Sequence, residues 1–168
     1  MIMSDRICLM RDGHIEQIGT PDELYFQPRT RFAAEFLGES NVLACEVVGV
    51  EAASAVVTAD GVRLRAPQDD RLRDARRVAL MVRPERLAIG DAQTAVSEMA
   101  NRLEGRLRQV IRVSGVTRYY VELDNGRTVV ATTLTGGAKT VTTPGSRVGL
   151  TWPPDAGILL PQVETGER

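Results

Sequence analysis

The alternation of short apolar segments with turn residues after residue 40 most constrains the fold of this chain. Roughly ten segments rich in Val, Leu and Ile follow one another, and turn signals recur about every 8–12 residues. Such closely spaced segments are typical of antiparallel strands in a barrel or sandwich, whereas helical spacing is confined to the N-terminal part. We therefore predict a mainly β fold.

The expected strands fall into two stretches of similar size, residues 39–90 and 91–162. In the first stretch we expect strands at 44–50, 53–58, 62–66 and 78–82, resuming at Leu87 and Ile89. In the second we expect strands at 102–113, 117–123, 128–133, 147–152 and 157–160. Each stretch could form a small barrel of the oligonucleotide/oligosaccharide-binding (OB) type, although no strict internal repeat is evident. Residues 163–168 are expected to be a frayed tail.

Turn residues mark the connections between these strands. Asp60-Gly61 stands between two Val-rich segments and predicts a tight hairpin, because an Asp-Gly pair readily adopts positive φ angles. Asp124-Asn125-Gly126 predicts a second turn of this kind. Pro153-Pro154 separates the last two strands.

The first 38 residues predict a β-hairpin followed by two short helices. Apolar residues stand on both sides of Asp12-Gly13, a pair that suits the turn of a hairpin. Thr20 and Glu23 form a capping box, in which each side chain accepts a hydrogen bond from the other residue's backbone amide. Pro21 suits the first helical position because its missing N–H would have no partner there.

The two helices after this cap are short. The first should end at Pro28, with Leu24 and Tyr25 facing inward. The second should begin at Thr30 and end at Gly38, for which we expect the left-handed conformation. The residues expected on one side of this helix are Phe32, Phe36 and Leu37. A hairpin and two short helices bury too little apolar surface to fold alone, so this part needs a partner surface.

The composition limits the partners open to the chain. Among 168 residues, 21 Lys and Arg face 22 Asp and Glu, and the net charge of -1 gives no global field for nucleic acid or anionic membrane. No apolar run approaches the roughly 18 residues of a membrane span, and the start lacks a signal-peptide pattern. Cys8 and Cys45 are expected to be buried, reduced thiols of a cytoplasmic protein.

Ordered motifs along nearly the whole chain carry a resemblance to a known family. Within residues 4–43 they are Ser4-Asp5-Arg6-Ile7-Cys8-Leu9-Met10-Arg11-Asp12-Gly13, Gly19-Thr20-Pro21-Asp22-Glu23-Leu24-Tyr25 and Phe36-Leu37-Gly38-Glu39-Ser40-Asn41-Val42-Leu43. Further on they are Val82-Arg83-Pro84-Glu85, Asn101-Arg102-Leu103-Glu104-Gly105, Tyr120-Val121-Glu122-Leu123-Asp124-Asn125-Gly126, Gly145-Ser146-Arg147-Val148 and Leu150-Thr151-Trp152-Pro153. Residues 1–38 resemble the end of the nucleotide-binding domain of ABC importer ATP-binding subunits. Residues 39–162 resemble the transport-associated OB (TOBE) region of the same subunits, most closely in importers for polyamines, iron and related solutes.

This resemblance implies an accessory, regulatory and dimerisation role rather than catalysis. In the family, the residues that bind and hydrolyse ATP lie before this region, so ATP and magnesium would belong to the parent domain. No catalytic, cofactor-binding or metal site is then expected in this chain. The implied partners are the ATPase core and the transmembrane permease subunits, at the inner face of the cell membrane. The exposed N-terminal part is expected to make the chain a homodimer, and the sequence does not name the transported solute.

A second class of function stays open at this stage. An OB-type domain can also bind a small anion such as molybdate, or nucleic acid. The net charge and the aromatic content of 4% argue against nucleic acid. The resemblance to polyamine-type importers argues against molybdate.

Candidate chemical sites are few. The nearest approach to a phosphate-binding loop is residues 136–140, where Ala138 stands in place of the glycine that must precede Lys139. His14, the single histidine, follows a hairpin turn without a neighbouring catalytic partner, so we expect a solvated residue. Arg83 and Glu85 suggest either an anion or acid/base site, or charges that pair with neighbours where Pro84 interrupts a strand.

The remaining charged and aromatic clusters favour structural roles. The arginines of residues 71–77 alternate with aspartates, which indicates a self-compensated, solvated face. The even-numbered arginines of residues 102–112 are expected on the outer face of one strand. Trp152 lies in an apolar strand and is assigned to the core rather than to a base-stacking surface. The family-motif positions singled out are Gly13, Thr20, Pro21, Glu23, Arg83, Pro84, Glu85, Gly126 and Trp152.

Overall fold

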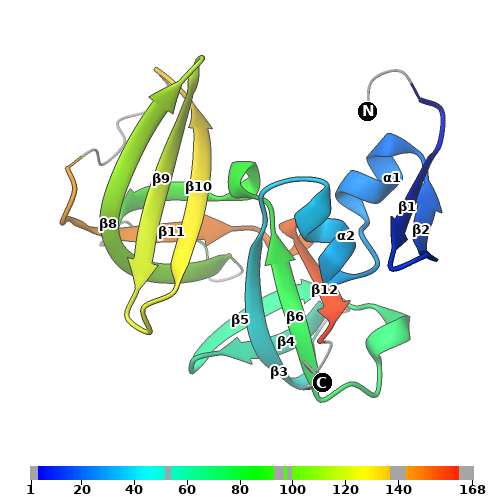
Figure 1. Ribbon diagram of the computed structural model, residues 1–168. Coiled ribbons are helices and arrows are strands. Elements are labelled where there is room, and N and C mark those ends of the chain that lie inside the picture. Colours follow the sequence, from blue (N-terminus) through cyan, green and yellow to red (C-terminus); the bar gives the residue numbers. More distant parts are fainter. Residues whose placement is uncertain (1–3, 52–53, 93–96, 98–99, 137–142, 163–168) are drawn as a thin grey trace.

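Two five-stranded antiparallel sheets, a two-stranded hairpin and two short helices make up the fold (Figure 1). The computed structural model describes residues 4–51, 54–92, 97, 100–136 and 143–162. The predicted loop at 137–140 and the predicted frayed tail at 163–168 lie outside these residues. The prediction of a mainly β, antiparallel fold preceded by a hairpin and two helices is confirmed.

The elements follow one another in the predicted order. The N-terminal elements are β1 (Ile7–Arg11), β2 (His14–Gly19), α1 (Pro21–Phe26) and α2 (Arg31–Phe36). The first sheet contains β3 (Asn41–Glu51), β4 (Ser54–Ala59), β5 (Val62–Pro67), β6 (Arg77–Val82) and β12 (Gly157–Pro161). The second sheet contains β7 (Ala88–Asp91), β8 (Asn101–Val113), β9 (Val116–Leu123), β10 (Thr128–Leu134) and β11 (Arg147–Trp152). Three 3-10 turns are η1 (Asp70–Leu72), η2 (Pro84–Arg86) and η3 (Pro154–Ala156). Below, residues 4–38 are called the hairpin–helix segment and the two large sheets the two-sheet body.

The two sheets repeat the same path, and each takes its last strand from the other half of the sequence. The first sheet has the order β5-β4-β3-β6-β12 and the second has the order β10-β9-β8-β11-β7. Strand β7 follows the first four strands along the chain but pairs in the second sheet, and β12 pairs in the first sheet. The sheets therefore cross the expected division at residue 90. The predicted domain limits, at residues 1–38, 39–162 and 163–168, remain a prediction.

The repeat extends to local irregularities. The register of β3 against β4 shifts between Val47 and Gly49, and that of β8 against β9 shifts between Leu107 and Gln109. A 3-10 turn follows the equivalent strands β6 and β11 in both halves. The chain thus contains a structural repeat that its sequence does not reveal.

One hydrophobic core lies between the sheets. A single cluster of buried side chains draws on strands of both, including Leu64 and Leu80 from the first sheet and Leu107, Val121 and Leu150 from the second. Both sheets turn their apolar faces toward this cluster, because alternate residues of a strand point to opposite faces. The two halves share their core, so neither buries its apolar face without the other.

Two asparagines hold the sheets together at equivalent places. Asn41 opens β3 and Asn101 opens β8, and both side chains are buried. The amide of Asn41 donates to the carbonyl of Val130 (2.8 Å) and accepts from its N–H (2.7 Å). Asn101 makes the same pair of bonds with Arg65, at 2.7 and 2.6 Å. Val130 lies on the edge strand β10 and Arg65 on the edge strand β5, so each asparagine takes the place of a neighbouring strand at an open edge.

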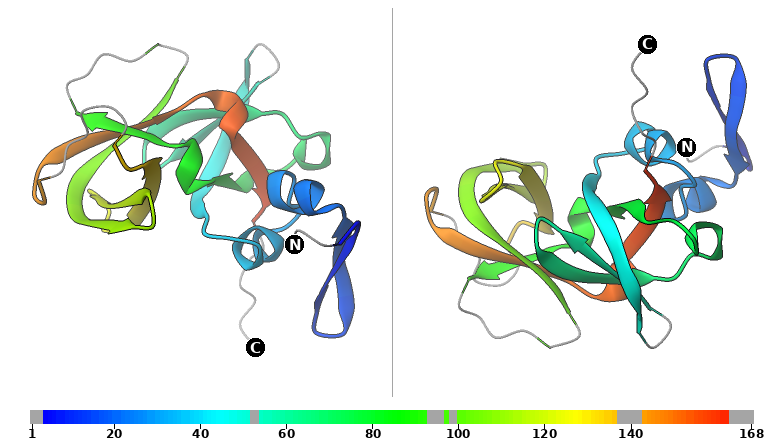
Figure 2. Two further views of the ribbon diagram at one scale, coloured as in Figure 1. Left: turned by 90° about the horizontal axis from the view of Figure 1, so that it is seen from above. Right: turned by 90° about the horizontal axis from the view of Figure 1, so that it is seen from below.

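The hairpin–helix segment has a small core of its own. It projects from the first sheet on the side away from the second sheet, as the two views in Figure 2 show. Its buried apolar residues are Leu9, Leu24 and Ala33. Helix α2 contacts the outer face of the first sheet through Ala34, which packs in a cluster with Met81 and Leu160.

The predicted N-terminal caps of both helices in this segment are present. Thr20 and Glu23 form the expected capping box, with hydrogen bonds of 2.8 and 3.2 Å, and Thr30 caps α2. Phe32 and Phe36 lie on one side of α2 as predicted, with 5.7 Å between their ring centroids, and Phe32 and Leu37 pack against the small core. The fully buried residues of α2 are Ala33 and Ala34, and Phe36 is 66% exposed.

Two expectations about single residues were wrong. Gly38 does not adopt a left-handed conformation. It is small because a Cβ atom there would lie 3.3 Å from the ring of Tyr25, which is tighter than ordinary van der Waals contact. Cys8 is exposed rather than buried, because it lies on the outer face of the hairpin, whereas Cys45 is buried as expected.

Candidate functional site

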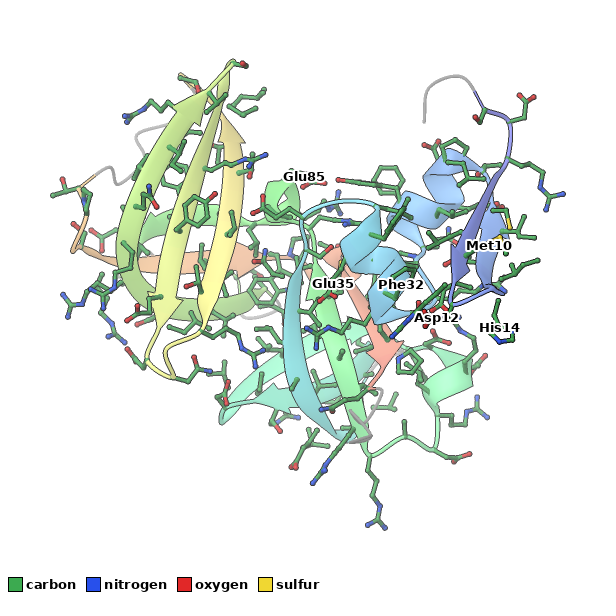
Figure 3. All side chains as sticks on the ribbon, viewed as in Figure 1. Met10, Asp12, His14, Phe32, Glu35 and Glu85 are labelled. Carbon is green, nitrogen blue, oxygen red and sulfur yellow. The ribbon has the colours of Figure 1, made fainter. Side chains whose placement is uncertain are left out.

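The Arg83-Pro84-Glu85 motif lies where the two-sheet body meets the hairpin–helix segment. It follows β6 directly, and Pro84 begins η2, so the chain turns away from the first sheet at this point. Arg83 is only 3% exposed, and Pro84 is also buried. Glu85, labelled in Figure 3, is exposed between the second sheet and the helices.

The guanidinium group of Arg83 is held by backbone carbonyls of both helices. Its Nη2 donates to the carbonyl of Tyr25 (2.9 Å), in α1, and its Nη1 donates to that of Ala34 (2.9 Å), in α2. Nη1 also lies within hydrogen-bond distance of the carbonyl of Gly38 (3.2 Å) and the hydroxyl of Ser40 (2.6 Å). Neutral acceptors thus meet both terminal nitrogens of the buried cation, whereas its Nε has no hydrogen-bond partner. Burial lowers the pKa of Arg83.

Tyr25 completes the junction from the helix side. Its ring lies under the guanidinium of Arg83, with 4.1 Å between the ring centroid and Cζ, an arrangement that a π face favours. The Tyr25 hydroxyl donates to the carboxylate of Glu85 over 2.7 Å. Burial, followed by the hydrogen bond and charge of Glu85, raises the pKa of Tyr25. Arg83 and Glu85 therefore pair with neighbours and form no acid/base couple with each other.

The other family-motif positions lie elsewhere and do not converge. Gly13 and Gly126 adopt φ angles of 81° in two hairpin turns, where a left-handed residue is required. The capping residues 20–23 lie at the start of α1. Trp152 is in the core as predicted, at 2% exposure, and its indole Nε1 has no hydrogen-bond partner. These positions support the fold rather than one site.

A cavity of about 530 Å³ opens where hairpins of the two sheets meet. Leu43 and Leu103 line it from equivalent places in β3 and β8. Carboxylates stand around it: Arg147 pairs with Asp124 at 3.1 Å and lies 3.7 Å from Glu104. The other lining residues are Ala59, Asp60, Val62, Arg102, Leu123 and Asn125. The two arginines of the lining, Arg102 and Arg147, pair with Glu104 and Asp124. An oxyanion would therefore meet three carboxylates and two cations that are already paired, which disfavours its binding.

The remaining candidates behave as structural groups. Asp69 pairs with Arg71 and Asp70 with Arg73, so the predicted self-compensated face is confirmed. His14 is exposed at the start of β2, as expected (Figure 3). Within the described part of the chain, no group of three or more His, Cys, Asp or Glu is placed to hold a metal ion.

Comparisons with known proteins relate part of this chain to a family. Residues 80–160, from within β6 into β12, are similar to the TOBE domain. The match thus includes Arg83, β7 and nearly all of β12, whereas the helices that Arg83 contacts lie outside it.

Relatives that match most of this chain are ATP-binding subunits of import systems. "Spermidine/putrescine import ATP-binding protein PotA" of Thermotoga maritima is 38% identical over 125 residues, which are 74% of this chain and 34% of the relative. "Fe(3+) ions import ATP-binding protein FbpC" of Rhizobium etli is 40% identical over 126 residues, 75% of this chain and 33% of the relative. PotA of Methylococcus capsulatus is 35% identical over 162 residues, 95% of this chain and 41% of the relative. The resemblance to the C-terminal part of ABC importer ATP-binding subunits is confirmed, and the chain spans between a third and about two fifths of these relatives.

A solved structure shows a similar fold. The cytoplasmic molybdate-binding protein ModG, with molybdate bound, superposes with a TM-score of 0.59 and 16% sequence identity. The match covers 72% of this chain and 96% of that one. At this identity the likeness concerns the fold, and it supports the predicted OB-like character.

Sequence reasoning missed the side chains that join parts of the molecule. Asn41 and Asn101 stood within motifs of the resemblance, but nothing in their neighbours predicts a bond to a distant strand edge. Each begins a strand with the pattern Asn-x-Leu, and this shared start was the one available signal. The hydrogen bonds of Arg83 to the two helices join residues 49 and 58 positions apart in the chain, beyond the reach of local patterns.

Proposed function

We propose that this chain is an accessory and regulatory module of an ABC importer ATP-binding subunit, without catalytic activity of its own. The observation that carries the proposal is a TOBE domain joined through Arg83 to a hairpin–helix segment. The resemblance of residues 1–38 to the end of a nucleotide-binding domain supports the view that the segment belongs to the ATPase side. ATP and magnesium would bind in that domain and not here.

The outer face of the β1–β2 hairpin is the surface we assign to the ATPase core. Met10 and Ile15 face each other across the strands, as do Cys8 and Ile18, and all four are exposed. Met10, labelled in Figure 3, is 55% exposed and Ile15 is 60% exposed, although apolar side chains of this size are usually buried. Burying this face against a nucleotide-binding core would remove the exposed apolar surface from water.

Two binding experiments test the proposal. In calorimetry the isolated chain should give no saturable heat with magnesium-ATP, and saturable binding would contradict the non-catalytic role. The nucleotide-binding part of the Thermotoga maritima relative, supplied separately, should bind the chain. Ile15→Glu should weaken this binding at least tenfold, whereas Val48→Glu, at a 56% exposed apolar position of the two-sheet body, should leave it unchanged. Equal losses in both variants would remove the hairpin from the interface.

Solute, location and assembly complete the proposal. The names of the relatives support polyamine or iron import, with the module at the cytoplasmic face of the membrane beside permease subunits. No helix of the described residues is long and apolar enough to cross a membrane.

We further propose a homodimer in solution, since the exposed hairpin would be covered by a second copy when no ATPase core is present. Light scattering that shows a monomer mass at all concentrations would contradict it.

The alternative function is an OB-fold binding module for a small anion. The fold shared with molybdate-bound ModG favours it. The lining of the inter-sheet cavity counts against it, because it holds three carboxylates, of Asp60, Glu104 and Asp124, and its two arginines are already paired with two of them. A thermal-shift screen with molybdate, sulfate, spermidine and a short oligonucleotide separates the readings. A shift with molybdate alone would favour the alternative, and one with the oligonucleotide alone would indicate nucleic-acid binding.

A further inference from the structure

Arg83 reaches from the two-sheet body to both helices of the hairpin–helix segment. We propose that Arg83 is the joint that couples the two parts, so that the order of residues 4–38 depends on this side chain while that of the two-sheet body does not. The inference deepens the regulatory role proposed above and rests on it for its biological meaning.

The chemistry of the contact explains why the residue is an arginine. The last carbonyl groups of a helix have no partner inside the helix. Tyr25 lies in the last turn of α1 and Ala34 in the last turn of α2, and Arg83 donates to the carbonyls of both. The planar fork of a guanidinium can serve two acceptors in different directions, whereas lysine offers one compact charge. A lysine at position 83 could therefore hold one helix end but not both.

Among the described residues, the other contacts named between the segment and the two-sheet body are small or belong to the same junction, as does the hydrogen bond from the Ser40 hydroxyl to the carbonyl of Ala34 (3.0 Å). The apolar contact between α2 and the first sheet is made by Ala34, whose side chain is a single methyl group. The ion pair of Arg118 with Glu39 spans 3.7 Å between two exposed side chains, and such pairs contribute little. The Tyr25–Glu85 hydrogen bond belongs to the same junction as Arg83. With three buried apolar residues, the segment cannot maintain its fold alone.

The second half of the two-sheet body has an equivalent of position 83 that is not an arginine. Pro153 occupies the place equivalent to Arg83, directly before the 3-10 turn that follows β11. Its φ and ψ angles are -72° and 151°, against -71° and 142° for Arg83. In both halves the residue's carbonyl accepts from the N–H three positions on, at 3.0 Å. The turn forms without an arginine, so the side chain of Arg83 serves the helices.

The joint lies beside a crossing between the sheets. From η2 the chain runs directly into β7, which pairs with β11 in the second sheet. A displacement of the helices would pull on Arg83 and so on the entry to β7. In an intact subunit, this path would carry movements of the ATPase side to the TOBE side.

Spin labels on the two parts measure the coupling in this chain. In a Cys8→Ser background, Asp22→Cys, at an exposed position of α1, takes one label, and Arg112→Cys, at an exposed position of β8, takes the other. Burial raises the pKa of Cys45 to about 11, so its thiol stays protonated and unlabelled at neutral pH. Trp152, the single tryptophan, reports on the core through its fluorescence.

Arg83→Pro copies the second half and should at least double the width of the distance distribution while the Trp152 emission stays unchanged. Amide exchange in α1 and α2 should accelerate about a hundredfold, with β8 and β9 unaffected. Arg86→Met, an exposed arginine in the same turn, is the matched control and should change neither readout. Arg83→Lys provides a second variant and should give an intermediate width.

Two results would overturn the inference. One is a distribution that stays narrow in Arg83→Pro with the Trp152 emission intact. The other is a loss of the buried Trp152 emission in both Arg83 variants, which would make Arg83 a residue of the core. Neither result involves ATP or an importer partner, so the regulatory proposal stands or falls separately, in the calorimetric and binding experiments above.

Discussion

The two halves of the two-sheet body follow one path with different residues. Position 45 of β3 and position 105 of β8 are equivalent, since Asn41 and Asn101 begin these strands. Cys45 fills its place with a buried thiol, whereas at Gly105 a Cβ atom would lie 2.5 Å from the carbonyl oxygen of Glu122. The same strand order therefore tolerates a side chain in one half and requires close backbone approach in the other. Apolar periodicity and turns specify the path, and single residues adjust the spacing.

Of the substitutions that test this comparison, Gly105→Ala should cause the largest loss of stability. The added methyl group would meet backbone, which cannot move aside cheaply, so we expect a loss of about 3 kcal/mol in the free energy of unfolding. Chemical denaturation monitored by Trp152 fluorescence measures it. Gly49→Ala is the control, because nothing lies within 4 Å of a Cβ there. Equal stability of the two variants would show that Gly105 is not tightly packed.

Asn41→Ala and Asn101→Ala test whether the halves are held equivalently. Each substitution leaves a backbone N–H and a C=O of an edge strand without its partner, which should cost about 2–3 kcal/mol. The two losses should agree within about 1 kcal/mol. Asn125→Ala, at an exposed turn, should cost far less. A large loss at only one site would mean that the joints are unequal.

Of the two equivalent positions, 45 and 105, only Cys45 carries a side chain that titrates. Alkaline pH should therefore change the stability that position 45 contributes and not that of Gly105. The pKa of Cys45 is raised from 9.0 to about 11 chiefly by burial, so the folded state holds the thiol proton more tightly than the unfolded state does. This contribution is fully present below pH 9 and is lost as the pH rises toward 11. It amounts to about 2 kcal/mol. Cys45→Ala should show a correspondingly shallower decline in stability over this range, and parallel curves would contradict the assignment.

The smallest effect is expected at the hairpin tips. Gly61 and Gly126 both adopt φ angles of 81° at equivalent turns, so alanine at either should cost about 1 kcal/mol. Thermal unfolding of Gly61→Ala and Gly126→Ala compares them. Gly149→Ala controls for the added methyl group, because Gly149 lies outside a turn and the nearest atoms to a Cβ there are at ordinary contact distances. A neutral result at one tip would show that the two turns relax differently.

Local signals allowed most of the fold to be predicted. The capping box of residues 20–23, the Asp60-Gly61 turn and the strands around them depend on neighbours in the sequence, and all are present. The exchange of β7 and β12 was not predictable in this way, because no local pattern states which sheet a strand joins. The same holds for Arg83, whose acceptors lie on helices distant in sequence. The ordered motifs of the resemblance predicted the family, and the site residues required three-dimensional contacts.

The late position of β12 in the chain has a consequence for biosynthesis. This strand lies beside β6 at one margin of the first sheet, yet it ends only at Pro161. As the ribosome releases the polypeptide from its N-terminus, residues 41–82 emerge long before the strand that completes their layer. The nascent first sheet must therefore wait with an uncovered margin until residues 157–161 have also left the exit tunnel. Maturation of both halves should then occur as one event, after β12 has emerged.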